Sequence, residues 1–262
     1  MGKYPDEKIP QQMSNLQIPN LVNNLVGKSL WVNSISKYSH SGNVQFKQMS
    51  SNPIIESENF ENLHPYKCDV SKEDEIVKMF DWIEATFGRL DICIPNAGFS
   101  ADKSLLNGSM KEWRAMLDVN VLGLNLCTQL AIKSMLEHGI KDGQIILLNS
   151  LSGHRVPQVF GGKSRFYSAT KFAVNALIEG WRQELREIEE NQIRIAQISP
   201  GVVETEFALV MNSGDKSAAD ALYTSMECLT ADDMAESVKF ILSAHPRMQI
   251  HDILVRPTAQ KF

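Results

Sequence analysis

The chain has 262 residues, of which 43% are hydrophobic and 22% charged, and its formal net charge is −5. This composition is ordinary for a soluble protein with one large core, and it predicts one α/β domain. The negative charge argues against nucleic acid or an anionic membrane surface as a partner, and no stretch has the length or hydropathy of a signal peptide or a membrane span, so we expect a cytoplasmic protein.

Residues 1–61 differ in composition from the rest of the chain. They contain 22 Asn, Ser and Gln residues and no alanine. Such a segment buries little apolar surface, and we expect at most one strand near residues 30–35 and a short helical piece. The sequence therefore predicts a divergent N-terminal segment, 1–61, followed by a folded core, 62–262.

From residue 62 onward, short apolar runs alternate with longer amphipathic ones. "LHPYKCDV" (63–70) is predicted as a strand, followed by a helix that Ser71 caps and Gly88 ends. "LDICIPNAG" (90–98) is predicted as a buried strand that ends in a turn. Ser109 and Glu112 form a capping box that opens a helix to about His138.

The second half of the core continues this alternation. "GQIILLNS" (143–150) and "IRIAQIS" (193–199) are apolar on both faces, as parallel strands are. A helix is expected from about 160 to 189 between them, another after the cap formed by Thr230 and Asp233, and a last strand in "HDILVRP". The prediction is a doubly wound parallel sheet flanked by helices, with the ligand at the carboxyl ends of its strands.

The cysteines and histidines show no spacing typical of a disulfide framework or a metal site. Cys68, Cys93, Cys127 and Cys228 lie far apart in the chain and are interpreted as reduced packing residues. No pair of histidines has the spacing of metal ligands on a helix, so we expect no metal.

Polar residues follow the predicted strands in a suggestive order. Asn96 and Ser150 each end a strand, Tyr167 and Lys171 lie four residues apart near the start of a helix, and Pro200 follows a further strand. Tyr4 and Lys8 have the same spacing, but Pro5 and the polar surroundings make a helical pair there improbable. What distinguishes the pair at 167 and 171 is the surrounding set of polar strand ends.

These motifs resemble the short-chain dehydrogenase/reductase family over residues 62–262. The matching stretches are "CDV" (68–70), "NAG" (96–98), Asn120, "NSLSG" (149–153), "YSATK" (167–171) and "SPGVVET" (199–205). "SGHRV", "GWRQELRE" and the terminal "RPTAQ" further resemble the branch of dehydrogenase/reductase member eleven and the insect farnesol dehydrogenases. The resemblance implies a Rossmann-like fold and an NAD(P)-dependent oxidoreductase, with NADP as the expected cofactor and NAD not excluded.

The resemblance also implies roles for individual residues. Ser150 would hydrogen-bond the substrate oxygen, Tyr167 would be the general acid/base, Lys171 would assist it, and Asn120 would hold a water that relays protons. The interval of 17 residues between Ser150 and Tyr167 is longer than in many members and requires a loop insertion. The implied cofactor contacts are Asp69 and Val70 for adenine, Asn96 and Ala97 for the adenosine ribose, Lys171 for the nicotinamide ribose, and Pro200, Gly201, Val203 and Thr205 for the nicotinamide end. Gly98 and Tyr167 complete the implied cofactor site.

Free tyrosine has a pKa of about 10 and is a poor base at neutral pH. Because Lys171 lies one helical turn from Tyr167, its ammonium and an oxidised nicotinamide would together favour the phenolate. Lowering the pKa by about three units needs roughly 4 kcal/mol of differential stabilisation. We therefore expect the pair to transfer a proton between the substrate and solvent.

The glycine-rich turn with which this family binds the cofactor pyrophosphate is absent. Before Gly88 the sequence has only Gly2, Gly27 and Gly42, and no two lie within ten residues. Losing two or three charge-assisted hydrogen bonds would weaken binding by roughly 3 to 9 kcal/mol. Three alternatives follow: an enzyme that holds its cofactor by other means, a catalytically impaired relative that binds a ligand or pairs with another subunit, or a chain whose N-terminal segment comes from another exon.

The segment 206–228 occupies the position of the family's variable substrate loop. Six of its residues could line an apolar pocket or form the packing face of a short helix: Phe207, Leu209, Val210, Met211, Leu222 and Tyr223. With the resemblance, this predicts a small hydrophobic alcohol or ketone as substrate, of isoprenoid or steroid type. A homodimer or homotetramer, formed through the helices at 109–138 and 160–188, is the implied assembly.

Overall fold

The computed structural model describes residues 36–38, 44–46, 64, 66–101, 103–158, 164–189 and 191–261. The strand expected near residues 30–35 and the boundary at residue 61 lie outside this part of the chain. Within the N-terminal segment, strand β1 (Ser36–Tyr38) pairs antiparallel with strand β2 (Val44–Phe46).

The described part of the main sheet is parallel and has the spatial order β3-β4-β5-β6. Its strands are β3 (Ile92–Cys93), β4 (Gln144–Leu148), β5 (Arg194–Pro200) and β6 (Asp252–Val255). All of β4 and nearly all of β5 are buried, as their continuous apolar sequences predict. Strand β3 is shorter than the predicted 90–98, because Pro95 has no amide hydrogen to donate to a ladder.

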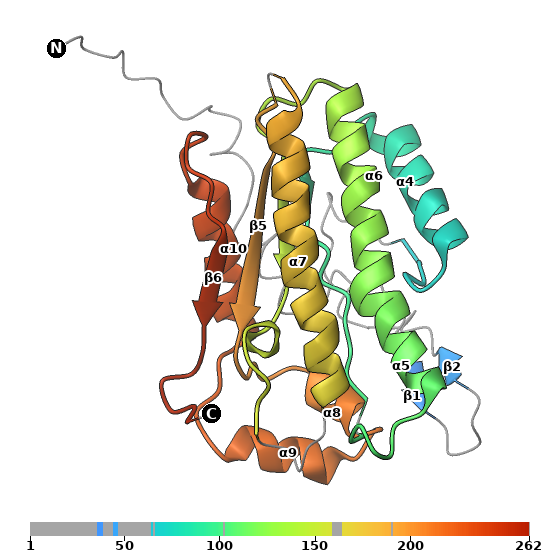
Figure 1. Ribbon diagram of the computed structural model, residues 1–262, viewed down its shortest axis with the longest axis vertical. Helices are drawn as coiled ribbons and strands as arrows, with labels where there is room; N and C mark the ends of the chain where they lie inside the picture. Colours follow the sequence, from blue (N-terminus) through green and yellow to red (C-terminus); the bar gives the residue numbers. More distant parts are fainter. Residues whose placement is uncertain are drawn as a thin grey trace, which may run out of the picture.

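Helices cover both faces of the sheet. Helices α4 (Glu73–Phe87), α6 (Leu124–Glu137) and α7 (Arg165–Glu187) lie side by side on one face, and α10 (Ala231–Ser243) lies on the other (Figure 1). One hydrophobic cluster joins α6 and α7 to β4 and β5, and a second joins α10 to the opposite face of the same strands. The predicted doubly wound α/β fold is confirmed.

Most of the helix ends are those that the sequence predicts. Both capping boxes, Ser109 with Glu112 and Thr230 with Asp233, form as expected, and Gly88 ends α4 with a φ of 75°. The cap predicted at Ser71 is wrong, because α4 begins after Lys72. The backbone N–H and the hydroxyl of Ser71 both donate to Asp69 Oδ1, at 3.0 and 2.7 Å.

The strand predicted at 63–70 is also wrong, since its described residues form no ladder. Cys68, Asp69 and Val70 are nevertheless buried, so the apolar pattern correctly indicated their environment. They pack against a helix: a Cβ added to Gly123 would lie 2.1 Å from the carbonyl oxygen of Val70. This segment is held by side-chain packing and by turns at Asp69.

The long helix expected from 109 to about 138 is present but contains a wider turn. It runs from α5 (Met110–Leu117) through a π-helical segment, η1 (Asp118–Gly123), into α6. By length and composition Met110–Glu137 could span a membrane, yet 44% of its most apolar window is buried inside the protein. Leu124, Ala131, Ile132 and Met135 of α6 belong to the hydrophobic cluster that packs on the sheet.

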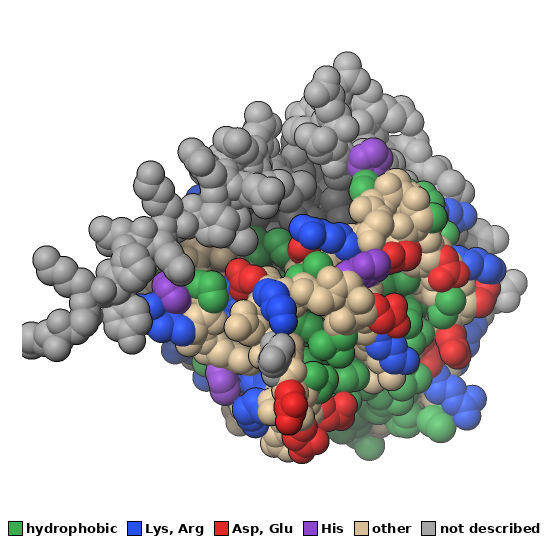
Figure 2. All heavy atoms as spheres, turned by 90° about the horizontal axis from the view of Figure 1, so that it is seen from above, with side chains coloured by type: hydrophobic (Ala, Val, Ile, Leu, Met, Phe, Trp, Pro, Cys, Tyr) green, Lys and Arg blue, Asp and Glu red, His purple; other side chains and the backbone are tan. Residues whose placement is uncertain are grey.

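Helix α7 begins at Arg165, later than the expected 160, and residues 160–163 are not described. Ser164, which precedes it, has a left-handed φ of 68°. Two short helices, α8 (Phe207–Met211) and α9 (Lys216–Thr224), lie beyond the carboxyl ends of β5 and β6 (Figure 1). Acidic and basic side chains are interspersed over the described part of the face in Figure 2.

Candidate active site

Ser150, Tyr167 and Lys171 meet at the carboxyl end of β4. Ser150 directly follows the strand and starts the 3-10 turn η2 (Leu151–Gly153), while the other two residues lie on α7. A hydrogen bond joins the side chains of Ser150 and Tyr167. Lys171 Nζ lies 5.7 Å from the centroid of the Tyr167 ring and donates to the carbonyl oxygen of Leu148 at 2.8 Å.

Burial shifts the pKa values of both members of the pair. Desolvation raises the pKa of Tyr167 to about 12, partly offset by the hydrogen bond from Ser150, and it lowers the pKa of Lys171 to about 8. The shift of Tyr167 is opposite in direction to the lowering expected from two neighbouring cations, because in the chain itself desolvation of the phenolate dominates. At neutral pH the pair is therefore a phenol beside an ammonium group.

Asn120 is fully buried within the π-helical segment η1. Its Nδ2 donates to the carbonyl oxygen of Phe99 at 2.9 Å and to Thr170 Oγ1 at 3.1 Å, and its Oδ1 accepts from the Phe99 amide at 3.0 Å. These bonds satisfy the side chain and connect the loop after β3 to α7. Asn120 thus lies beside Lys171, as expected, and holds this region together.

The loop after β3 approaches the same place. A Cβ on Gly98 would lie 3.3 Å from Asn120 Oδ1 and 3.6 Å from Lys171 Nζ. Asn96 and Ala97 precede it and are half-buried. Val70, which follows Asp69, also approaches η1, where its carbonyl oxygen contacts Gly123.

The residues at the end of β5 and after it contact three different parts of the protein. The amide of Gly201 donates to the carbonyl oxygen of Val255, and a Cβ there would meet Gln260, so Pro200 and Gly201 pack against the C-terminal segment. Val203 packs against the hydrophobic cluster under α10. Thr205 is exposed, and its Oγ1 accepts from the amide of Phe207 at 3.2 Å.

Apolar residues lie close to the reactive tyrosine. The Phe207 ring lies 5.5 Å from the Tyr167 ring, and Phe166 stacks on Trp113 at 5.2 Å. Met211 is buried on the inner side of α8. Phe207 thus lies against Tyr167, while Met211 is a packing residue.

Comparison with known proteins defines the family. The family model of the short chain dehydrogenases matches residues 47–216. The chain belongs to the short-chain dehydrogenase/reductase family. It is 49% identical over 198 residues to dehydrogenase/reductase SDR family member 11 of Bos taurus, covering 76% of each chain, which confirms the predicted branch.

Two further similarities agree with this family. The chain is 40% identical over 206 residues to a farnesol dehydrogenase of Aedes aegypti, covering 76% of this chain and 77% of the relative. A solved serine dehydrogenase in complex with NADP+ superposes with a TM-score of 0.68 at 27% identity, covering 75% of this chain and 77% of that one. The chain is thus an oxidoreductase of an NAD(P)-dependent family.

The polar groups of this short-chain dehydrogenase/reductase fit the two ends of a dinucleotide. Asp69 Oδ2 is buried and forms an ion pair with Lys72 Nζ at 3.5 Å, while Asp69 Oδ1 accepts from Ser71. Lys171 Nζ gives one hydrogen bond to Leu148 and retains donors for ribose hydroxyls. The sequence offers no glycine-rich turn for the pyrophosphate between these ends.

Within the described residues, no group of three or more His, Cys, Asp or Glu side chains could hold a metal ion. All four cysteines are free thiols. Burial raises the pKa of Cys68 to about 12, so this thiol is unreactive at neutral pH.

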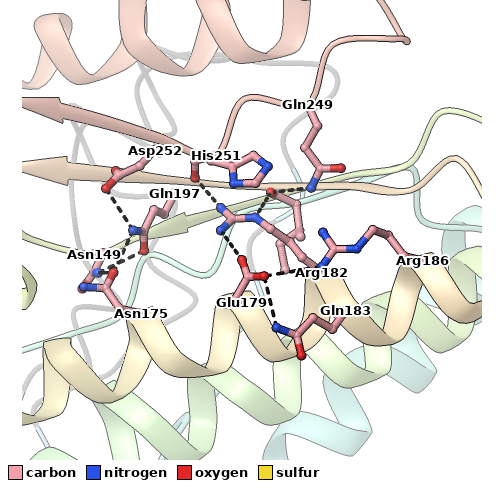
Figure 3. A network of polar contacts seen from close by, with 11 residues as sticks. Asn149, Asn175, Glu179, Arg182, Gln183, Arg186, Gln197, Gln249, His251 and Asp252 are labelled. Atoms are coloured by element: carbon pink, nitrogen blue, oxygen red, sulfur yellow. Dashed lines mark hydrogen bonds and ion pairs between the residues drawn. The ribbon is translucent and has the colours of Figure 1, made fainter.

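Sequence reasoning missed a set of polar residues behind the site. Asn149, Asn175, Gln197 and Asp252 are linked by hydrogen bonds between α7 and the strands β4 to β6 (Figure 3). A signal was available at Gln197, a buried amide in the otherwise apolar strand "IRIAQIS". A buried amide requires partners, but the sequence could not say which ones.

Proposed function

We propose that this chain interconverts a hydrophobic alcohol and its carbonyl with NADP as cofactor and Tyr167 as general acid/base. The observation that carries the proposal is the convergence of Ser150, Tyr167 and Lys171 at one strand end, with Ser150 hydrogen-bonded to Tyr167. Bound NADPH supplies the hydride that adds to the carbonyl carbon.

In the direction of reduction, the carbonyl oxygen gains negative charge and needs a proton. Tyr167, with a pKa of about 12, is a neutral phenol at pH 7 and donates that proton. Ser150 donates a hydrogen bond to the same oxygen and holds it near the phenol. Lys171 then stabilises the phenolate, because its pKa of about 8 keeps most of the ammonium protonated at neutral pH.

Asp69 and Val70 are assigned to adenine, Asn96 to Gly98 to its ribose, and Lys171 to the nicotinamide ribose. Pro200, Gly201, Val203 and Thr205 are assigned to the nicotinamide end. The burial of Asp69 and Val70 beside η1 supports the first assignment, and the donors that Lys171 retains beside its hydrogen bond to Leu148 support the third. Asn120 is assigned to the proton relay through a water, supported by its place beside Gly98 and Lys171.

An apolar substrate is supported by the rings around Tyr167. Phe207 lies against Tyr167, and both belong to a cluster with Ala101 and Met116. An isoprenoid alcohol or a keto-steroid offers the apolar surface that these side chains would cover. The activity in the name of the Aedes aegypti relative makes farnesol the first substrate to test.

We also infer a cytoplasmic homodimer or homotetramer formed through α6 and α7. Leu122 in η1, beside α6, and Phe172 on α7 are 61% and 44% exposed. Burying them between two copies would remove this apolar surface from water.

The test is turnover by the purified full-length chain. We expect farnesol to reduce NADP+, followed by the absorbance of NADPH, and Tyr167→Phe to lower kcat by about 100-fold to 10,000-fold. Tyr66→Phe is the matched control, since Tyr66 packs against Trp82 at 4.9 Å, away from Ser150, and should retain activity.

NADPH binding, measured by its fluorescence, tests the cofactor assignment separately. No binding at about millimolar NADPH, or turnover that survives Tyr167→Phe, would refute the proposed function. A stable dimer on size-exclusion chromatography without binding or turnover would instead support the catalytically impaired alternative, for which the missing glycine-rich turn is the evidence.

A further inference from the structure

Three side-chain amides and one carboxylate are linked next to Ser150, and we call them the amide network: Asn149, Asn175, Gln197 and Asp252 (Figure 3). Asn149 Nδ2 donates to Asn175 Oδ1 at 2.8 Å and to Gln197 Oε1 at 3.0 Å. Gln197 Nε2 donates to Asn175 Oδ1 at 2.7 Å and to Asp252 Oδ2 at 3.0 Å. The network joins Asn149, which follows β4, to Gln197 in β5, Asp252 at the start of β6 and Asn175 on α7.

The two ends of the network fix the orientation of every amide in it. Asn175 Nδ2 donates to the carbonyl oxygen of Gly153 at 2.7 Å, and a carbonyl only accepts. Asn175 Oδ1 must therefore be the acceptor for Asn149 and Gln197. At the other end, the Asp252 carboxylate also only accepts, so Gln197 must present its NH₂ group. One arrangement of donors and acceptors satisfies all these contacts.

The amide network lies between the turn that begins at Ser150 and the helix that carries Lys171. Asn149 precedes Ser150, and Asn175 lies one helical turn beyond Lys171 on α7. A Cβ on Gly153 would lie 2.8 Å from the carbonyl oxygen of Lys171 and 2.9 Å from Asn149 Nδ2. The turn η2 therefore rests directly on α7, and the hydrogen bond from Asn175 fixes it there.

A second contact holds the far end of this turn. His154 Nε2 lies 2.9 Å from Ser199 Oγ and 3.0 Å from Asp252 Oδ2. The turn that begins at Ser150 is thus fastened at Gly153 by Asn175 and at His154 by β5 and β6. Side chains on three elements fix the backbone that presents the Ser150 hydroxyl.

We propose that Asn175 is a positioning residue, which holds the turn η2 on α7 and so sets Ser150 against Tyr167. The inference rests on the proposed function, because it gives Ser150 and Tyr167 their roles. Without the Asn175 hydrogen bond the turn can move away from α7, and misplacement of a reacting group by about 1 Å costs up to about 100-fold in rate.

The experiment compares Asn175→Ala and Asn175→Asp with the parent chain. Asn175→Asp keeps the acceptor for Asn149 and Gln197 but points a second oxygen at the Gly153 carbonyl, so it isolates the donor. Asn191→Ala is the matched control: Asn191 also donates to a backbone carbonyl, that of Leu185 at 2.8 Å, near the opposite end of α7.

We expect both Asn175 variants to lower kcat by about 10-fold to 100-fold, with the KM for NADP+ within about twofold of the parent value. In the background of Ser150→Ala, the further loss caused by Asn175→Ala should be less than about twofold, since the two act through one contact. Hydrogen exchange measured by mass spectrometry should be faster in a peptide covering residues 151–156 in Asn175→Ala, and unchanged there in Asn191→Ala.

The outcomes separate this inference from the proposed function. A parent chain without turnover refutes the function, and with it the role of Asn175 in the reaction, even if exchange at residues 151–156 is faster. Turnover with kcat unchanged in both Asn175 variants refutes the positioning role alone. An equal loss of kcat in Asn191→Ala, or full additivity with Ser150→Ala, assigns Asn175 to general stability and also refutes it.

Discussion

Replacing Lys171 by methionine should stabilise the folded chain at neutral pH while removing its activity. Burial lowers the pKa of Lys171 from 10.5 to about 8, which means that the folded state holds the ammonium group at a cost. Methionine fills a similar volume without a charge, so Lys171→Met avoids that cost. The same substitution removes the cation that supports the Tyr167 phenolate.

The size and sign of the effect follow from the two pKa values. Below about pH 8 both the folded and the unfolded parent chain carry the proton, and the cost is roughly 3 kcal/mol. Between about pH 8 and pH 10.5 the unfolded chain binds more protons than the folded chain, so the parent becomes more stable as the pH rises. The stability difference, variant minus parent, should therefore fall by about 2.5 kcal/mol between about pH 7 and about pH 10.

The assay is urea unfolding followed by tryptophan fluorescence at a series of pH values in this range. Loss of the hydrogen bond from Lys171 to Leu148 lowers the stability of the variant by the same amount at every pH. It therefore shifts the stability difference between variant and parent without changing how that difference depends on pH. Lys133→Met is the control, because Lys133 is exposed on α6. The difference in the free energy of unfolding between Lys133→Met and the parent should not change over this pH range.

A difference for Lys171→Met that changes by less than about 0.5 kcal/mol over the same range would refute the reasoning. It would mean that the ammonium group of Lys171 is hydrated in the folded chain. The description of the site as a desolvated phenol and ammonium pair would then be wrong, and with it the raised pKa of Tyr167.

Two further predictions test contacts that position the site. Gly123→Ala should destabilise the chain by about 2 to 4 kcal/mol, because its Cβ would lie 2.1 Å from the Val70 carbonyl oxygen. Gly180→Ala on α7 meets nothing within 4 Å and should stabilise the chain by about 0.5 to 1 kcal/mol. Urea unfolding of both variants checks this, and equal changes in the free energy of unfolding would contradict it. Tyr223→Phe removes the hydroxyl that accepts from the Ala208 amide at 3.1 Å and donates to the Thr205 carbonyl at 2.7 Å. We expect the KM for the alcohol to be about 3-fold to 10-fold higher, with little change in kcat. An unchanged KM in steady-state kinetics would count against a role of α8 in the substrate site.

The elements that the sequence predicted well are those set by local chemistry. Two capping boxes, the glycine that ends α4 and the buried strands β4 and β5 could be read from residues close together in the chain. The predictions failed where the secondary structure of a segment depends on a partner that is distant in the sequence. The apolar run at 63–70 indicated burial correctly, but whether it forms a strand depends on a neighbouring backbone, and in the described residues it packs on a helix.

For the site, the sequence by itself indicated which polar residues meet and on which strand ends and helix they stand. The Tyr–Lys spacing and the polar strand ends were sufficient to bring Ser150, Tyr167 and Lys171 to one place. Only the tertiary structure decided the state of these groups, because desolvation depends on everything packed around them, and in the chain without cofactor it raises the pKa of Tyr167. It also decided the amide network, since the partners of Asn175 come from strands whose proximity no local pattern encodes.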